Sequence, residues 1–383
     1  MNDRFAAFLS RSRWTCAIMA LAYHVRFLQL VDYDAVDAKS PLSKVFYFLT
    51  GLGHESFAVV FVLDGIAAGL ILLHRRDPGA LARHLGAFYR LLLPGLLSGA
   101  ALDGLGMRFF NQSGIYTNYP DFSTLTLGYS TLLGNAFMLQ PFVVPTFGSN
   151  GMLYLLSYLF WCCILLHLFL RAGAGGKRRG RIVQTALMAL VLILMPAQFL
   201  TWAAIWLTGV AVVVVGRSRI WRPSRWLASV GFLSTLVLSR LIGSNSRLLP
   251  QPFGTWLVHY KYLLVGAGFA LLAWALYPDP TSANWNLSST AIDGRERRDG
   301  ASFTFFFHFA VVMLIFACAT VLLHQPLMQQ PTLLRYAGFA VIVSVTIGIT
   351  IGIARAFAAV LDRIYIRINP LMKSISLRKL KRE

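Results

Sequence analysis

Imidazole and carboxylate side chains stand inside two neighbouring apolar segments of the sequence, and they are the residues best suited to acid–base chemistry. His24 lies within residues 14–30 and Asp64 within residues 57–74. A carboxylate beside an imidazole fixes the tautomer of the ring and raises its basicity, so that the ring can take a proton from a hydroxyl group. The alternatives are that His24 only packs against another helix and that Asp64 forms a structural ion pair with Arg26 or Arg240.

The segments that carry these residues are long and apolar. Of the 383 residues, 57% are hydrophobic and 13% are charged, whereas about a quarter of the residues of a soluble domain are charged. A helix needs about 20 mostly apolar residues to cross a bilayer. The sequence therefore predicts an all-α, polytopic transmembrane helix bundle with about ten spans, at residues 14–30, 57–74, 88–103, 151–171, 181–195, 198–216, 226–242, 257–277, 303–323 and 333–358.

The positive charges indicate the orientation of these spans. The chain has 35 Lys and Arg against 15 Asp and Glu, and 27 of the 35 fall in the termini and in alternate connecting segments. Because cytoplasmic loops of membrane proteins are rich in Lys and Arg, both termini are predicted to be cytoplasmic. The charges form separate short clusters, which excludes a nucleic-acid-binding face. Residues 1–358 form the predicted transmembrane domain, and residues 359–383 form a basic cytoplasmic tail that lies on membrane lipid.

Depth in the membrane predicts that His24 and Asp64 meet. At 1.5 Å per residue, His24 lies about 9 Å below the outer end of its span and Asp64 about 10 Å below the outer end of the next. His308, in the ninth span, is predicted to be a packing residue. Arg240 and Lys261, near the outer ends of their spans, either snorkel to the interface or take part in function. The four cysteines lack the spacing of a metal site, and no metal is expected.

Further candidates lie near the predicted outer face. His54 and Glu55 stand where the second span begins, so that they either cap the helix or meet a substrate that enters from outside. Asn150 is in the same way a helix cap for the fourth span or a hydrogen-bond partner for a sugar. The stretch Leu125–Val144 is moderately apolar but broken by glycines and a proline, and it is predicted to be a re-entrant or interfacial piece.

Several ordered motifs of the first half resemble those of the integral-membrane acyltransferase-3 family. They are Arg13 and His24 with ten residues between them, residues 53–65 (GHESFAVVFVLDG), Leu102 and Asp103 with residues 134–140 (GNAFMLQ), and residues 148–161 (GSNGMLYLLSYLFW). The family has an Arg-x10-His motif in its first span, a GHEAVxxFFVLSGY stretch and a GSNGPLWSLxxEFWYY run. The resemblance covers residues 13–161 and extends to the C-terminus by topology alone.

This resemblance implies a bacterial inner-membrane enzyme that transfers an acyl group, commonly acetyl, from cytoplasmic acyl-CoA to a hydroxyl of an extracytoplasmic polysaccharide. His24 would be the general base or the acyl carrier, and both roles stay open. Arg13, Arg83 and Arg90 would hold the donor phosphates, because guanidinium binds phosphate bidentately. The implied partners are the glycan, a polysaccharide synthase and an acyl-carrying periplasmic protein.

The sequence also departs from the family pattern. Asp64 stands in place of a Ser, His84 and Ala87 in place of two Arg, Leu155 in place of a Ser and Leu159 in place of a Glu. We hypothesise that Asp64 replaces the carboxylate lost at Leu159. The competing interpretation is a catalytically degenerate member that serves as a membrane scaffold or export partner in polysaccharide synthesis. A glycan or lipid transporter is the third alternative.

Overall fold

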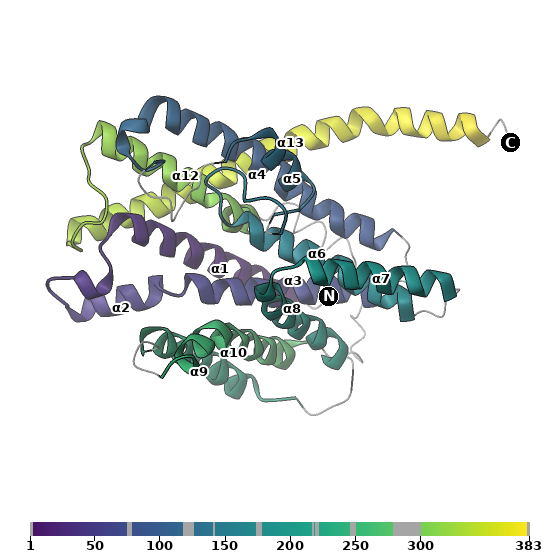
Figure 1. Ribbon diagram of the computed structural model, residues 1–383, viewed down its shortest axis with the longest axis horizontal. Coiled ribbons are helices and arrows are strands. Elements are labelled where there is room, and N and C mark those ends of the chain that lie inside the picture. Colours follow the sequence, from purple (N-terminus) through teal and green to yellow (C-terminus); the bar gives the residue numbers. More distant parts are fainter. Residues whose placement is uncertain are drawn as a thin grey trace.

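The computed structural model of the protein describes residues 3–74, 79–117, 126–140, 142–173, 178–216, 218, 222–245, 250–278 and 300–380; the side chains of residues 3, 72–74, 80, 83, 361 and 364–380 are not described. Within these residues the chain forms no β-strand, only an isolated parallel bridge between Leu30 and Gln329. The predicted all-α fold is therefore confirmed. Figure 1 shows the helices packed side by side, with most of them aligned along the long axis of the molecule.

Ten long helices of the described chain overlap the ten predicted apolar segments. They are α1 (Asp3–Gln29), α3 (Gly53–His74), α4 (Ala80–Phe110), α6 (Leu153–Gly173), α7 (Arg178–Leu194), α8 (Ala197–Gly216), α9 (Arg225–Asn245), α10 (Phe253–Leu276), α12 (Gly300–Leu322) and α13 (Leu333–Leu380). Two shorter helices, α2 (Pro41–Thr50) and α5 (Tyr129–Ala136), lie in the long connecting segments. Pro196 separates α7 from α8, as proline favours, because its ring lacks the N–H that a continuing helix needs.

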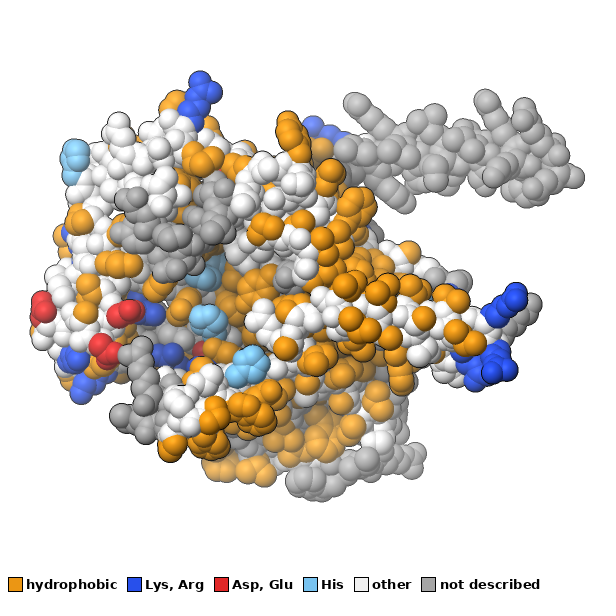
Figure 2. Space-filling model, viewed as in Figure 1, with side chains coloured by type: hydrophobic (Ala, Val, Ile, Leu, Met, Phe, Trp, Pro, Cys, Tyr) orange, Lys and Arg blue, Asp and Glu red, His pale blue; other side chains and the backbone are white. Residues whose placement is uncertain are grey.

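Eight stretches of the described chain are long and apolar enough to cross a membrane, and they fall on α3, α4, α6, α8, α9, α10, α12 and α13. Two helices lie outside this set for evident reasons. α7 has only 17 residues, and α1 carries Arg13, His24 and Arg26 within its apolar part. The chain is thus a helical bundle with several helices able to span a membrane, whereas ten spans and cytoplasmic termini remain predictions. Figure 2 shows hydrophobic side chains over much of the middle of one face.

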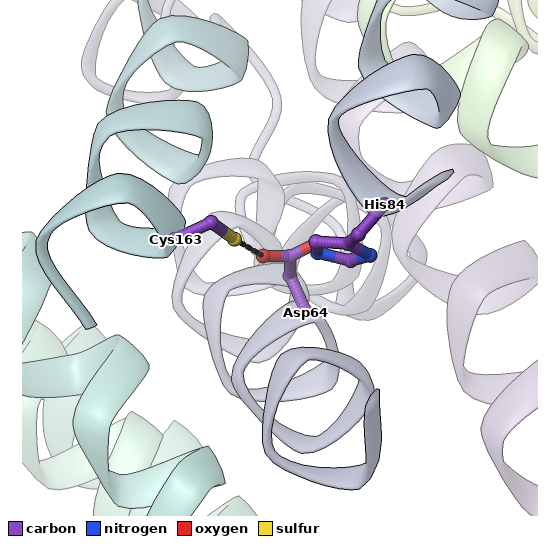
Figure 3. A group of neighbouring side chains, drawn as sticks. All are labelled: Asp64, His84 and Cys163. Atoms are coloured by element: carbon purple, nitrogen blue, oxygen red, sulfur yellow. Dashed lines mark hydrogen bonds between the residues drawn. The ribbon is translucent and has the colours of Figure 1, made fainter. Parts of the chain in front are cut away.

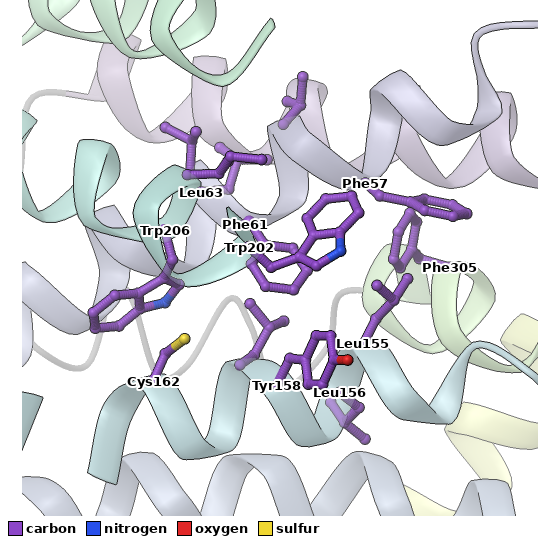
Figure 4. Close-up of a cluster of buried hydrophobic side chains, with 14 of the residues drawn as sticks. Phe57, Phe61, Leu63, Leu155, Leu156, Tyr158, Cys162, Trp202, Trp206 and Phe305 are labelled. Atoms are coloured by element: carbon purple, nitrogen blue, oxygen red, sulfur yellow. The ribbon is translucent and has the colours of Figure 1, made fainter. Parts of the chain in front are cut away.

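Helix α3 lies at the centre of the bundle and packs on α1, α8 and α10. Its contact with α8 is closest, because Gly65 of α3 and Gly209 of α8 leave no room for a Cβ between the two backbones. Large buried side chains fill the space around this contact, among them Phe61, Tyr158 and Trp206. Figure 4 shows Phe61 of α3 with Trp202 of α8 near Tyr158 of α6, and Trp206 of α8 beside Cys162 of α6. The centre of the bundle is therefore densely packed and holds α1 and α3 in a fixed register.

Helix α13 has 48 residues and runs without interruption past residue 358. The boundary between the predicted transmembrane domain and the basic tail therefore falls within one continuous helix. Figure 1 shows the last turns of α13 extending beyond the other helices.

Candidate active site

Two histidines that are 284 residues apart in the sequence form a hydrogen-bonded pair inside the bundle. Nδ1 of His24, on α1, lies 2.8 Å from Nε2 of His308, on α12. Nδ1 of His308 lies 2.7 Å from the carbonyl oxygen of Thr304, one turn earlier on α12. Because α1 and α12 pack against each other, the pair is held by two long helices and not by a loop.

The carbonyl group of Thr304 fixes the tautomers of both rings. A carbonyl oxygen only accepts hydrogen bonds, so the proton of neutral His308 must be on Nδ1, and its Nε2 is an acceptor. His24 must then donate from Nδ1 to His308. This chain of hydrogen bonds leaves Nε2 of His24 without a proton, which is the state that a general base needs.

His24 and His308 differ in their exposure. His308 is fully buried, whereas His24, Tyr23 and His54 are each partly exposed. The Tyr23 ring contacts the His24 ring at 5.3 Å between centroids and the His54 ring at 4.8 Å. Figure 2 shows histidine side chains in a hollow of the face in view, with acidic and basic side chains on one side of it.

The structure does not form the predicted His24–Asp64 pair. Gly53, where α3 begins, packs on the side chain of Tyr23, so the start of α3 lies at the level of His24 in the adjacent α1. α3 then runs back along α1 (Figure 1), and Asp64, ten residues beyond His54, lies about 15 Å away along the bundle. The depth argument was wrong because it set the outer ends of both helices at one height, whereas α1 continues above Tyr23 to Gln29.

Asp64 belongs instead to a second polar group, at the middle of α3, α6 and α8. Its Oδ2 accepts a hydrogen bond from Nε1 of Trp206 at 2.8 Å and lies 3.9 Å from the thiol of Cys163. Figure 3 shows Asp64 between Cys163 of α6 and His84 of α4. One ligand atom from each of Asp64, His84 and Cys163 lies within 4.8 Å of the others. These are groups that could hold a metal ion, but the hydrogen bonds to Asp64 account for its burial without one.

Glu55 and His54 lie within the first turn of α3, and Glu55 does not act as a helix cap. Its carboxylate is buried, accepts a hydrogen bond from Oγ of Ser239 at 2.9 Å and lies 3.7 Å from Nζ of Lys261. Oε2 of Glu55 has no partner among the described residues. Glu55 therefore links α3 to α9 and α10.

Part of the predicted re-entrant stretch enters the bundle. The carbonyl oxygen of Met138 accepts hydrogen bonds from Ser157 and from Trp161, and Trp161 is eight residues into α6, about 12 Å along that helix. The side-chain amide of Asn135 supports this loop. Its Nδ2 donates hydrogen bonds to the carbonyl oxygens of Thr131 and Pro145, and its Oδ1 accepts one from the backbone N–H of Phe147. Two residues of the stretch, Leu125 and Pro141, lie outside the described residues.

Asp103 and Ser149 anchor the end of that loop. The buried carboxylate of Asp103 accepts hydrogen bonds from the backbone N–H of Ser149 at 2.8 Å and from its Oγ at 2.6 Å. Gly148 has φ +69 and faces Asp103 so closely that a Cβ would approach its carboxylate. Asn150, next in the chain, is buried, and neither polar atom of its side-chain amide has a partner in the described chain. It does not cap α6 with its side chain, so sugar binding is the prediction that stays open for it.

The Ser149→Ala variant is expected to lower the free energy of unfolding by about 1.5–3 kcal/mol, because a hydrogen bond to a buried carboxylate is lost. The backbone bond from residue 149 remains, so the chain still folds. The matched control is Ser244→Ala, at an exposed position of α9, which should change stability by less than about 0.5 kcal/mol. Thermal unfolding of both variants in detergent checks this, and equal stabilities would contradict the anchoring role.

The predicted donor-binding arginines lie on α1 and α4. Arg13 is eleven residues before His24 on α1, about 16 Å along the helix. Arg90 is on α4, and both arginines have interactions of their own within the structure. Arg83 is also on α4, but its side chain is not described. A donor that reaches from Arg13 to His24 would therefore lie along α1.

His308 is the functional candidate that the sequence prediction missed. Its position in an apolar span was a signal, because imidazole is costly in a bilayer, but the sequence did not show which helix it faces. The fold is a helical bundle with several helices able to span a membrane, and it contains a partly buried histidine pair. Comparison of the chain with models of protein families, with curated proteins and with solved structures found no match. The resemblance described above therefore rests on the motif residues themselves.

Proposed function

We propose that this protein is an O-acyltransferase of the bacterial inner membrane, with ten spans and both termini in the cytoplasm. It transfers an acyl group, acetyl in the simplest case, from cytoplasmic acyl-CoA to a hydroxyl of an extracytoplasmic polysaccharide. The observation that carries the proposal is the hydrogen-bond chain from Thr304 through His308 to His24. This chain orients an unprotonated nitrogen inside the bundle, and an acyltransferase that activates a hydroxyl needs such a base.

The reaction follows from this geometry. Nε2 of His24 takes the proton of the sugar hydroxyl while the hydroxyl oxygen attacks the carbonyl carbon of the thioester. A C–O bond forms, the C–S bond breaks, and the coenzyme A thiolate leaves and takes up a proton. The route in which His24 first carries the acyl group uses the same nitrogen as nucleophile. Arg13, about 16 Å away on the same helix, supports binding of the donor phosphates with its guanidinium group.

The positive residues support the side from which the donor comes. Arg13 lies on the same side of His24 as Asp64, and α6 passes Asp64 at Cys163 and has Arg171 in its last turn. Basic segments, such as the one that begins at Arg171, mark the cytoplasmic side. Labelled acetyl-CoA offered to one side or the other of proteoliposomes tests this. Transfer to polysaccharide on the opposite side is expected only when the donor is on the side of these basic segments. Transfer from the other side alone would contradict the proposed orientation, and polysaccharide movement without acetyl-CoA consumption would indicate a transporter.

The second candidate function is a scaffold or export partner in a polysaccharide synthesis complex. It is favoured by the substituted motif positions, since Asp64 and Leu159 do not supply a carboxylate to His24. The His24–His308 pair argues against it, because a scaffold has no need of an oriented, unprotonated imidazole nitrogen.

The His308→Leu variant is expected to slow acyl transfer roughly 10- to 1,000-fold, a part of the contribution of a general base. His308 acts by positioning His24, so kcat should fall while KM for acyl-CoA changes little. Steady-state kinetics of the purified variant checks this, with thermal unfolding measured in parallel. A fall that only follows lost stability, or a rise in KM alone, would contradict the positioning role.

A further inference from the structure

Three cationic side chains from three helices gather at the level of His54. They are Arg26 of α1, Arg240 of α9 and Lys261 of α10. Arg26 and Lys261 are only 8% and 7% exposed, and Arg240 is partly buried. Arg240 is close enough to interact electrostatically with both of the others and with His54. Cationic side chains inside a bundle of apolar helices are costly, so such a group calls for a functional explanation.

The carboxylates nearby are too few to neutralise this group. Glu55 lies 3.7 Å from Lys261 and is the buried carboxylate of the cluster. Asp32 is near Arg26 but is exposed. Among the residues that the structure describes, no carboxylate lies within 4.0 Å of Arg26 or Arg240. Three positive charges therefore face one buried negative charge.

The two guanidinium groups also have unused donors. Arg26 lies over the rings of Tyr23 and Tyr47, at 5.6 and 5.1 Å from their centroids. Arg240 donates from Nη1 to the carbonyl oxygen of Gly51 at 3.2 Å. In both arginines Nε is buried and has no hydrogen-bond partner in the part of the chain that the structure describes. A guanidinium group held by ring faces and a carbonyl, with donors to spare, is well suited to bind a carboxylate or a phosphate.

The cluster adjoins the histidine pair. Arg26 is two residues after His24, and the ring of Tyr23, which contacts the rings of both His24 and His54, also lies under the Arg26 guanidinium. We propose that Arg26, Arg240 and Lys261 form a binding site for an anionic group, carboxylate or phosphate, on the glycan that accepts the acyl group. The anion site holds this group so that a neighbouring sugar hydroxyl reaches Nε2 of His24. Oε2 of Glu55, which has no partner among the described residues, accepts a hydrogen bond from another sugar hydroxyl. The identity of the ligand as the acceptor rests on the proposed function.

Burial argues for a glycan over a lipid headgroup. Arg26 and Lys261 face the inside of the bundle, whereas Lys44 of α2, at the same end of the molecule, is exposed. A lipid in the outer leaflet would meet exposed cations such as Lys44 first. The matched control for the buried cations is therefore Lys44→Gln, which removes the same charge from an exposed position.

The test measures binding of defined probes to the full chain in nanodiscs of zwitterionic lipid. The probes are tetragalacturonate with its neutral methyl ester, and mannose 6-phosphate with mannose. At least one anionic probe should bind about tenfold or more tightly than its neutral counterpart, and Arg26→Gln or Arg240→Gln should raise its Kd by about 10- to 100-fold. Arg26→Lys keeps the charge but loses the planar donor pair of the guanidinium group, so it should raise the Kd less. Lys44→Gln should leave the Kd unchanged.

Several results would overturn the anion site. The first is equal binding of the charged and neutral probes. The second is an unchanged Kd in both glutamine variants, provided that they elute as folded protein. The third is loss of all probe binding when phosphatidylglycerol is added to the nanodisc. The last result would assign the cations to a lipid. Acyl transfer is measured separately on the same samples. An inactive protein that prefers anions disproves the proposed function alone, whereas an active protein without this preference disproves the anion site alone.

Discussion

The His24→Gln variant is expected to lower acylation of the surface polysaccharide by about 10²- to 10⁴-fold, the contribution of a general base. Glutamine is close to histidine in size and still offers a donor to His308, but it has no basic nitrogen. The chain should therefore fold and insert as before. Ester content of the extracted polysaccharide, measured by NMR in a strain that carries the variant as its only copy, gives the result.

A matched control separates chemistry from packing. His259 is exposed on α10, where it contacts Thr201 and the ring of Tyr260, so His259→Gln should leave ester content unchanged. If His24→Gln keeps full acylation while deletion of the whole protein abolishes it, the scaffold interpretation is favoured and the enzyme proposal fails.

The Gly65→Ala variant is expected to destabilise the bundle by about 3 kcal/mol, the upper end of the range for an overpacked core. A Cβ at residue 65 would collide with the backbone oxygen of Trp206, and one at Gly209 would collide with the backbone oxygen of Val62. Backbone cannot move aside as a flexible side chain can, so α3 and α8 must separate. Because Trp206 also donates to Asp64, this separation would disturb the polar group around Asp64 as well.

Gly231→Ala is the control for this prediction. Gly231 lies inside α9, and nothing stands within 4 Å of an added Cβ. Alanine is the better helix former by about 1 kcal/mol, so this variant should be as stable as the unmodified chain or more stable. Thermal unfolding in detergent compares the two. Equal stability of Gly65→Ala and Gly231→Ala would show that α3 and α8 do not approach as closely as described.

The helices could be predicted from the sequence because each depends on a local property. Apolar runs predicted all ten long helices, and Pro196 marked the break between α7 and α8. The bounds differ by several residues where polar residues extend a helix beyond its apolar part, as at the start of α1, which begins at Asp3 and not at residue 14.

The partners of the site residues could not be predicted in the same way. His24 meets His308 because α1 and α12 pack together, and no local pattern encodes a contact between residues so far apart in the chain. Asp64 was assigned to His24 from its depth, but depth depends on the relative height of α1 and α3. That height is set by the packing of Gly53 against Tyr23, which the sequence alone does not reveal.

The measurement that tests the central claim most directly is the release of coenzyme A by the purified protein. The acceptor is surface polysaccharide from a strain that lacks the protein, and the donor is acetyl-CoA. We predict one coenzyme A released for each acetyl ester formed, and a rate at least about 10²-fold lower with His24→Gln. No release by the unmodified protein, or equal release by His24→Gln, would contradict the claim that this chain transfers the acyl group with His24 at its reacting centre.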